Sequence, residues 1–140
     1  PDLPQDAEAA ARRHFPESES GGDQIFSNVL GEFVTYLLLR EELDEETARE
    51  GAAGWDGDLV VLKKIPGTEE GEILEMTFCW DSEAEAFEFR RAYEQYLLNR
   101  YQAIPNGAND EEGFLAMVLD ENRISIVSEG STLYISTIFP

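Results

Sequence analysis

Five short apolar segments, separated by turn-forming sequences, constrain the fold of this 140-residue chain more than any other feature. Residues 59–62 are a continuous apolar run, which is typical of a strand covered on both faces. Over 73–80 large apolar side chains alternate with smaller or polar ones, which predicts an amphipathic strand. Three more strands are expected over 114–119, 123–127 and 133–138. Because tight turns connect the last three, we expect neighbouring strands to pair antiparallel.

Helical periodicity appears in three other places. Apolar residues over 25–38 recur at i, i+1, i+4 and i+5, which predicts a long helix that contains Gly31 at a cost of about 1 kcal/mol relative to alanine. A short helix is expected over 45–53, and a capping box at Ser82 begins a third helix that runs to about Asn99. The sequence therefore predicts an α+β fold, an antiparallel sheet of about five strands with two or three helices packed on one face, in the order α-α-β-β-α-β-β-β.

The first 24 residues differ from the rest in composition. Residues 1–24 contain three prolines and the Ser/Gly-rich run 18–22, so we expect a lead-in or linker with a short helical turn around 7–13. Residues 25–140 are expected to form a single α+β domain. The chain begins at Pro1 with neither an initiator Met nor a signal sequence, so we expect a processed form or a piece of a longer protein.

The charge of the chain limits its partners. Ten Lys and Arg against 30 Asp and Glu give a formal net charge of -20, which repels phosphate backbones and anionic lipid surfaces. We expect no nucleic-acid partner, and no membrane insertion because no segment reaches about 18 continuous apolar residues. The oligomeric state stays open. A hydrophobic fraction of 42% is nonetheless enough for a core. The expected core residues include Trp55, Phe78, Trp80 and Phe89.

Few residues suggest a catalytic or metal site. His14 is the single histidine and Cys79 the single cysteine, so we expect no histidine-dependent nucleophile, no tightly bound zinc and no cofactor. We expect His14 to be a solvated surface residue and Cys79 a buried thiol. Asp56 and Asp58 flank Gly57, and two carboxylates on such a turn can converge on a hard cation. The other interpretation is an ordinary turn that enters a strand.

Three blocks carry a resemblance to a known group of proteins. They are an LGE…LLL block over 30–39, the AAGWDGD block over 52–58 and the WDSEAEAFEF block over 80–89. In this order they resemble the C-terminal region of secreted bacterial and archaeal proteins in which similar blocks follow a zincin-like domain. The resemblance implies an accessory domain beside a peptidase-like module. None of that group's zinc ligands lies in this chain, so no catalytic residue is transferred.

Three functions are consistent with these observations. The first is a non-catalytic accessory or binding domain of a secreted or cell-surface protein that supports a peptidase-like module or a protein partner. The alternative is a small hydrolase that uses carboxylates, or carboxylates with a divalent metal, in a pocket between the 25–38 helix and the sheet. The third is an acidic module that binds a basic protein. A pocket lined by convergent carboxylates would favour the hydrolase.

Overall fold

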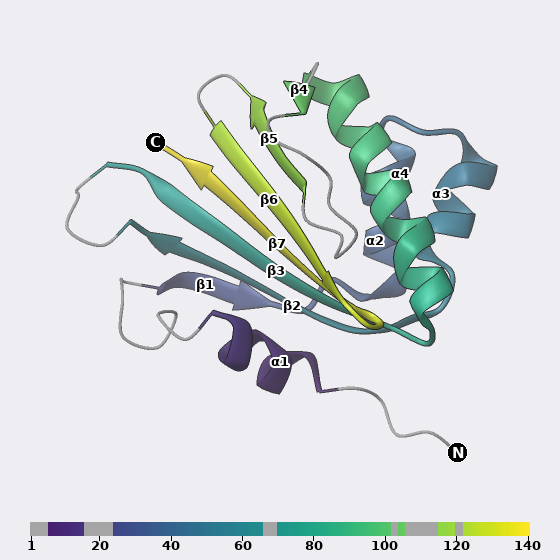
Figure 1. The fold of residues 1–140 in the computed structure, drawn as a ribbon, viewed down its shortest axis with the longest axis horizontal. Helices are drawn as coiled ribbons and strands as arrows, with labels where there is room; N and C mark the ends of the chain where they lie inside the picture. Colours follow the sequence, from purple (N-terminus) through teal and green to yellow (C-terminus); the bar gives the residue numbers. More distant parts are fainter. Residues whose placement is uncertain (1–5, 16–23, 66–69, 102–103, 106–114, 120–121) are drawn as a thin grey trace.

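A computed structural model describes residues 6–15, 24–65, 70–101, 104–105, 115–119 and 122–140 of the chain (Figure 1). Four helices and seven strands lie in these ranges. The helices are α1 (Ala7–His14), α2 (Gly31–Arg40), α3 (Glu45–Ala52) and α4 (Glu83–Tyr101). The strands are β1 (Gln24–Asn28), β2 (Trp55–Lys64), β3 (Glu72–Trp80), β4 (Ile104–Pro105), β5 (Leu115–Leu119), β6 (Asn122–Glu129) and β7 (Thr132–Phe139).

The strands form one sheet in the order β1-β2-β3-β7-β6-β5-β4, and each neighbouring pair is antiparallel. The α+β class and the antiparallel sheet with packed helices are therefore confirmed. The five predicted strands correspond to β2, β3, β5, β6 and β7. The structure adds β1 at one edge of the sheet and the two-residue β4 at the other.

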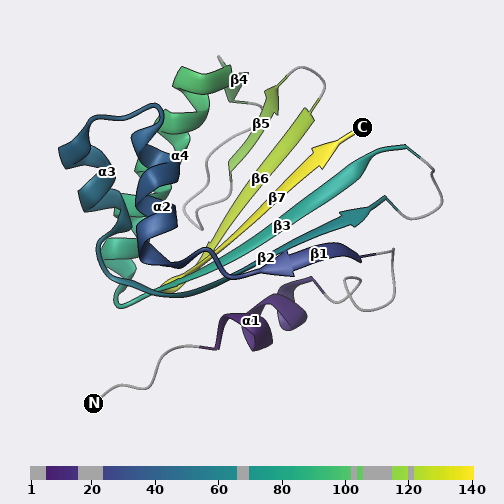
Figure 2. The same cartoon turned by 180° about the vertical axis from the view of Figure 1, so that it is seen from behind.

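The helices lie on both faces of the sheet (Figures 1 and 2). The helices α2, α3 and α4 pack together on one face, where α4 contacts β3 and β7 and α2 contacts β2. The helix α1 contacts β2 and β3 from the opposite face. It belongs to the segment that we interpreted as a lead-in, and three of its four alanines, Ala7, Ala10 and Ala11, are buried. We call the two sides of the sheet the α4 face and the α1 face.

The core lies between the α4 face and the helices. Phe78 and Trp80 of β3 and Phe89 of α4 are fully buried, as predicted, with ring centroids 4.7–6.2 Å apart. Trp55 is only half-buried and packs at the edge of this cluster. The alternation along β3 sends Phe78 and Trp80 to the α4 face and Thr77 and its alternate neighbours to the α1 face, so both sides of this strand are covered.

The predicted helix over 25–38 was wrong in its first part. Residues 24–28 form β1, and the helix α2 begins only at Gly31, which has a φ of 85°. The boundary is set by Asp58, whose carboxylate accepts the N–H groups of Leu30 and Gly31 at 2.7 and 2.9 Å. This carboxylate caps the helix from a strand 27 residues further along the chain. The periodicity within 25–38 therefore could not predict where the helix begins.

The other helix starts are set locally and agree with the prediction. Asp44 accepts the N–H of Thr47 at 2.7 Å at the start of α3, and Ser82 Oγ accepts the N–H of Glu85 at 3.2 Å at the start of α4. Both are side-chain caps that satisfy a backbone donor left over at a helix N-terminus.

Candidate binding surfaces

The predicted cation ligand Asp58 is buried and already bonded. Its side chain accepts hydrogen bonds from the N–H groups of Leu30 and Gly31 and from Trp55 Nε1, the last at 2.9 Å. The residue is 3% exposed. Three N–H donors therefore surround this carboxylate, which links β2 to α2 and to the indole of Trp55. Its oxygens have a structural role as hydrogen-bond acceptors.

The second predicted ligand, Asp56, is half-buried in β2, beside an irregularity in the pairing with β3 between Trp55 and Gly57. The segment 56–58 is thus part of a strand and not a turn before it. The charge of Asp56 helps to raise the pKa of Cys79, a residue on the α1 face, whereas Asp58 caps α2 on the α4 face. In the described ranges, no three His, Cys, Asp or Glu side chains gather as a metal site would require.

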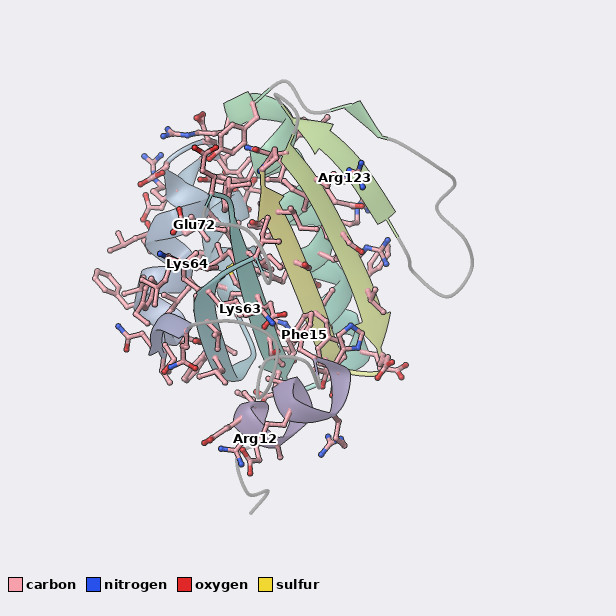
Figure 3. All side chains as sticks on the ribbon, turned by 90° about the vertical axis from the view of Figure 1, so that its left-hand side faces the viewer. Arg12, Phe15, Lys63, Lys64, Glu72 and Arg123 are labelled. Carbon is pink, nitrogen blue, oxygen red and sulfur yellow. The ribbon has the colours of Figure 1, made fainter. Side chains whose placement is uncertain are left out.

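The α1 face contains a buried ion pair that the sequence analysis missed. Lys63 Nζ lies 3.1 Å from Glu75 Oε2, and the two side chains are only 3% and 9% exposed. In Figure 3 Lys63 points across the sheet towards Phe15, whereas its neighbour Lys64 points away. The alternation of the strands could have revealed the pair. Glu75 lies opposite Val61 of β2, and Lys63, two residues after Val61, is on the same face of the sheet.

The end of α1 rests on the same face through an aromatic stack. The ring of His14 lies parallel to that of Tyr134 with a centroid distance of 3.9 Å, and Phe15 meets Tyr134 edge-on at 6.0 Å. Burial lowers the pKa of His14, while the charges of Glu129 and Glu75 act in the opposite direction. The prediction of a solvated His14 was therefore wrong, because α1 packs on the sheet.

The thiol of Cys79 is buried, as predicted, on the α1 face of β3. Burial raises its pKa, and the hydroxyl of Thr132 donates to Sγ at 3.8 Å. A thiol with a raised pKa is a poor nucleophile at neutral pH, so Cys79 acts as a small packing residue.

A cavity of about 190 Å³ lies between α4 and the sheet. Leu38, at the end of α2, is the one residue of 25–38 in its described lining, so the cavity only borders the place in which the hydrolase alternative needs a pocket. The described lining contains aliphatic, aromatic and neutral polar side chains and no Asp or Glu. It consists of Leu38, Leu74, Met76, Tyr93, Tyr96, Leu97, Tyr101, Asn122, Ile124, Thr137 and Phe139.

An exposed apolar surface runs from β1 into α2. Phe33, Val34 and Leu37 occupy one side of α2, and β1 leads directly into this helix. The apolar residues of β1 and of the junction are also exposed. We call this the β1–α2 surface, and it comprises Ile25 (46% exposed), Phe26 (46%), Val29 (55%), Phe33 (69%), Val34 (44%) and Leu37 (44%).

Comparison with known proteins gives a family and nothing further. A family model described as "Domain of unknown function (DUF8575)" matches residues 18–138. No curated protein and no solved structure matches the chain. None of the described helices is long and apolar enough to cross a membrane. The helix α1 lies before the matched residues, although it packs on the sheet that they form.

Proposed function

We propose that this chain, which belongs to the DUF8575 family, is a non-catalytic binding domain that docks a basic protein partner on its β1–α2 surface. The observation that carries the proposal is the exposure of six large apolar side chains within 13 consecutive residues. Exposed large apolar side chains that lie together on a monomer often mark an interaction site.

The position of β1 supports a partner that adds a strand. This strand is at the edge of the sheet and pairs with β2 on its inner side. An edge strand offers backbone N–H and C=O groups to another chain, and β1 has no charged or proline residue that would discourage this pairing. An extended segment on β1 would lie beside the strand that leads into α2.

Charge decides what kind of partner fits. With a net charge of -20, two copies of this chain repel one another, whereas a segment with Lys or Arg on either side of its apolar residues is attracted. Glu32 is exposed in the first turn of α2, next to Phe33, where its carboxylate can pair with a Lys or Arg of such a segment. We therefore propose an extended apolar segment with basic flanks as the occupant.

The resemblance described above suggests where such a partner is found. It implies an accessory domain that supports a peptidase-like module in a secreted or cell-surface protein, and we extend the proposal to that setting. The docking surface itself rests on the exposure of β1 and α2 and on the charge of the chain.

A pair of designed peptides tests the proposal. Both have the same ten-residue core of alternating apolar and polar residues, flanked by two lysines in one and by two glutamates in the other. We expect the lysine-flanked peptide to bind at least tenfold more tightly in fluorescence anisotropy at low salt. Phe33→Ser should weaken its binding at least fivefold. Phe87→Ser, which changes another exposed phenylalanine, on α4, should leave binding unchanged.

Two results would overturn the proposal. One is equal binding of the lysine-flanked peptide to the wild type, the Phe33 variant and the Phe87 variant. The other is a dimer of the wild-type chain in light scattering that Phe33→Ser converts to a monomer, because a second copy would then occupy the surface.

A further inference from the structure

The cavity between α4 and the sheet differs from the β1–α2 surface in shape and chemistry. It is a recess of about 190 Å³ whose walls come from α2, α4, β3, β6 and β7. Leu74, Met76 and Ile124 of the sheet form an apolar wall opposite α4. An apolar cavity of about 150 Å³ is known to accept benzene, so this volume fits a single six-membered ring with a small substituent.

Tyrosines supply the helix side of this cavity. Tyr93, Tyr96 and Tyr101 all line it from α4, and the rings of Tyr93 and Tyr96 stack with centroids 5.7 Å apart. Burial is the main cause that raises the pKa of both Tyr93 and Tyr96, and the nearby Tyr101 raises both further. The hydroxyls of Tyr93 and Tyr96 therefore remain protonated near neutral pH.

The sheet contributes neutral polar groups as well. Thr137 of β7 is 6% exposed and Asn122 begins β6, and both line the cavity. A ligand inside thus meets hydroxyl and amide groups that can donate or accept hydrogen bonds, within an otherwise apolar wall. This combination is typical of small-molecule sites, in which a few polar groups fix the orientation of an apolar ligand.

The charges around the cavity select against anions. Glu41 and Glu42 both act to raise the pKa of Tyr96, whereas Arg100 acts to lower it and lies 3.7 Å from Glu42. Since the carboxylates outnumber the guanidinium here and the whole chain has a charge of -20, a negatively charged ligand is repelled.

We propose that the tyrosine-lined cavity binds a neutral single-ring molecule that has one hydrogen-bonding substituent, of the size and polarity of a phenol. The apolar walls bury the ring, and the hydroxyls of α4 together with Thr137 or Asn122 bind the substituent. This site is separate from the proposed protein-docking surface, so either can be tested without the other.

Three probes of equal ring size test the chemistry. We expect phenol to give saturable chemical-shift changes in the amides of α4 and β3, with a Kd of about 0.1–1 mM, in the range open to so small a ligand. Benzene should bind more weakly for want of a substituent, and benzoate should bind at least tenfold more weakly than phenol because of its charge.

Variants locate the site. Leu74→Phe fills the cavity from the sheet side and should abolish phenol binding, while Leu98→Phe, on an exposed position of α4 outside the lining, should leave it unchanged. Tyr93→Phe and Tyr96→Phe remove a hydroxyl and keep the ring, so at least one should weaken phenol threefold or more without affecting benzene.

The proposal fails if phenol and benzoate bind alike, or if Leu74→Phe and Leu98→Phe bind phenol with the wild-type affinity. It also fails if neither tyrosine variant changes the preference for phenol over benzene, an outcome that remains readable even if Leu74→Phe does not fold.

Discussion

The two faces of the sheet are built from the same strands and are buried in different ways. On the α4 face, β3 contributes Phe78 and Trp80 to an aromatic cluster with Phe89, and the covering helix has large side chains of its own. On the α1 face the same strand contributes Glu75, Thr77 and Cys79, and the residues of the covering helix that are fully buried are alanines. The burial of apolar area stabilises the packing on the α4 face. On the α1 face, the small alanines let α1 approach the sheet closely, and a buried ion pair lies on the same face.

The α1 face includes a buried hydroxyl. The hydroxyl of Thr77 on the α1 face is buried without a hydrogen-bond partner among the described residues. An unsatisfied buried hydroxyl costs stability, by about 1–3 kcal/mol.

The largest expected effect is on the α4 face. Trp80→Ala removes a fully buried indole from the aromatic cluster and should lower the free energy of unfolding by about 3–5 kcal/mol, measured by urea denaturation. Phe87→Ala, which removes an exposed ring from α4, is the control and should shift the urea midpoint little. An unchanged midpoint for Trp80→Ala would contradict the core assignment.

The next effect concerns the ion pair on the α1 face. Glu75→Gln leaves the ammonium of Lys63 buried without its countercharge and should cost about 3 kcal/mol. The double variant Lys63→Met/Glu75→Leu replaces the pair with apolar side chains and should be within about 1 kcal/mol of the wild type.

Lys64 and Glu72 provide the matched control for this test. They oppose one another across the same two strands, but both are exposed (Figure 3). Glu72→Gln should cost less than about 1 kcal/mol, as is usual for exposed charges. Equal losses for Glu75→Gln and Glu72→Gln would show that burial adds nothing to the Lys63–Glu75 pair.

A smaller effect is expected at the buried carboxylate beside the α4 face. Asp58→Ala leaves the N–H groups of Leu30 and Gly31 and the indole N–H of Trp55 without their acceptor, at a cost of about 2 kcal/mol. Asp58→Asn retains one side-chain oxygen and should lose about half as much. If a chelator lowers the free energy of unfolding of the wild type, and neither variant differs in stability from the chelator-treated wild type, Asp58 binds an ion instead.

The smallest effect is the pH dependence of α1 docking. Burial lowers the pKa of His14 below its usual 6.5, so the folded state binds this proton less tightly than the unfolded state does. The docking of α1 is therefore complete above pH 6.5 and weakens as the pH falls below it. Hydrogen-exchange protection of the α1 amides should fall in this range while that of α4 does not, and His14→Phe should remove the difference. Protection that increases in acid would show that Glu129 and Glu75 dominate.

The parts of the fold that were predictable are those decided by near neighbours. The alternation along β3 and the caps at Asp44 and Ser82 act within a few residues, so the strand and both helix starts could be predicted from the sequence. The start of α2 could not, because it depends on Asp58 of β2. The stretch 25–38 has an apolar pattern that suits a helix throughout, and only the tertiary contact divides it into β1 and α2.

The candidate sites show the same limit. Asp56 and Asp58 were chosen for their spacing, and the structure places one near Cys79 and the other at the start of α2. The stack of His14 on Tyr134 joins residues 120 apart in the chain, and the tyrosine-lined cavity needs α4 placed over the sheet. Neither can be read from local patterns, because each requires the packing to be known.

The bonds from Asp58 also determine how the molecule opens. Because the first turn of α2 is capped by a side chain of β2, the helix cannot begin in isolation, and it loses its cap whenever β2 separates from its neighbours. In native-state hydrogen exchange, the amides of Leu30 and Gly31 should therefore exchange together with those of β2, as one cooperative unit. The β1–α2 surface is carried by this unit, so its shape persists only while the central sheet is intact.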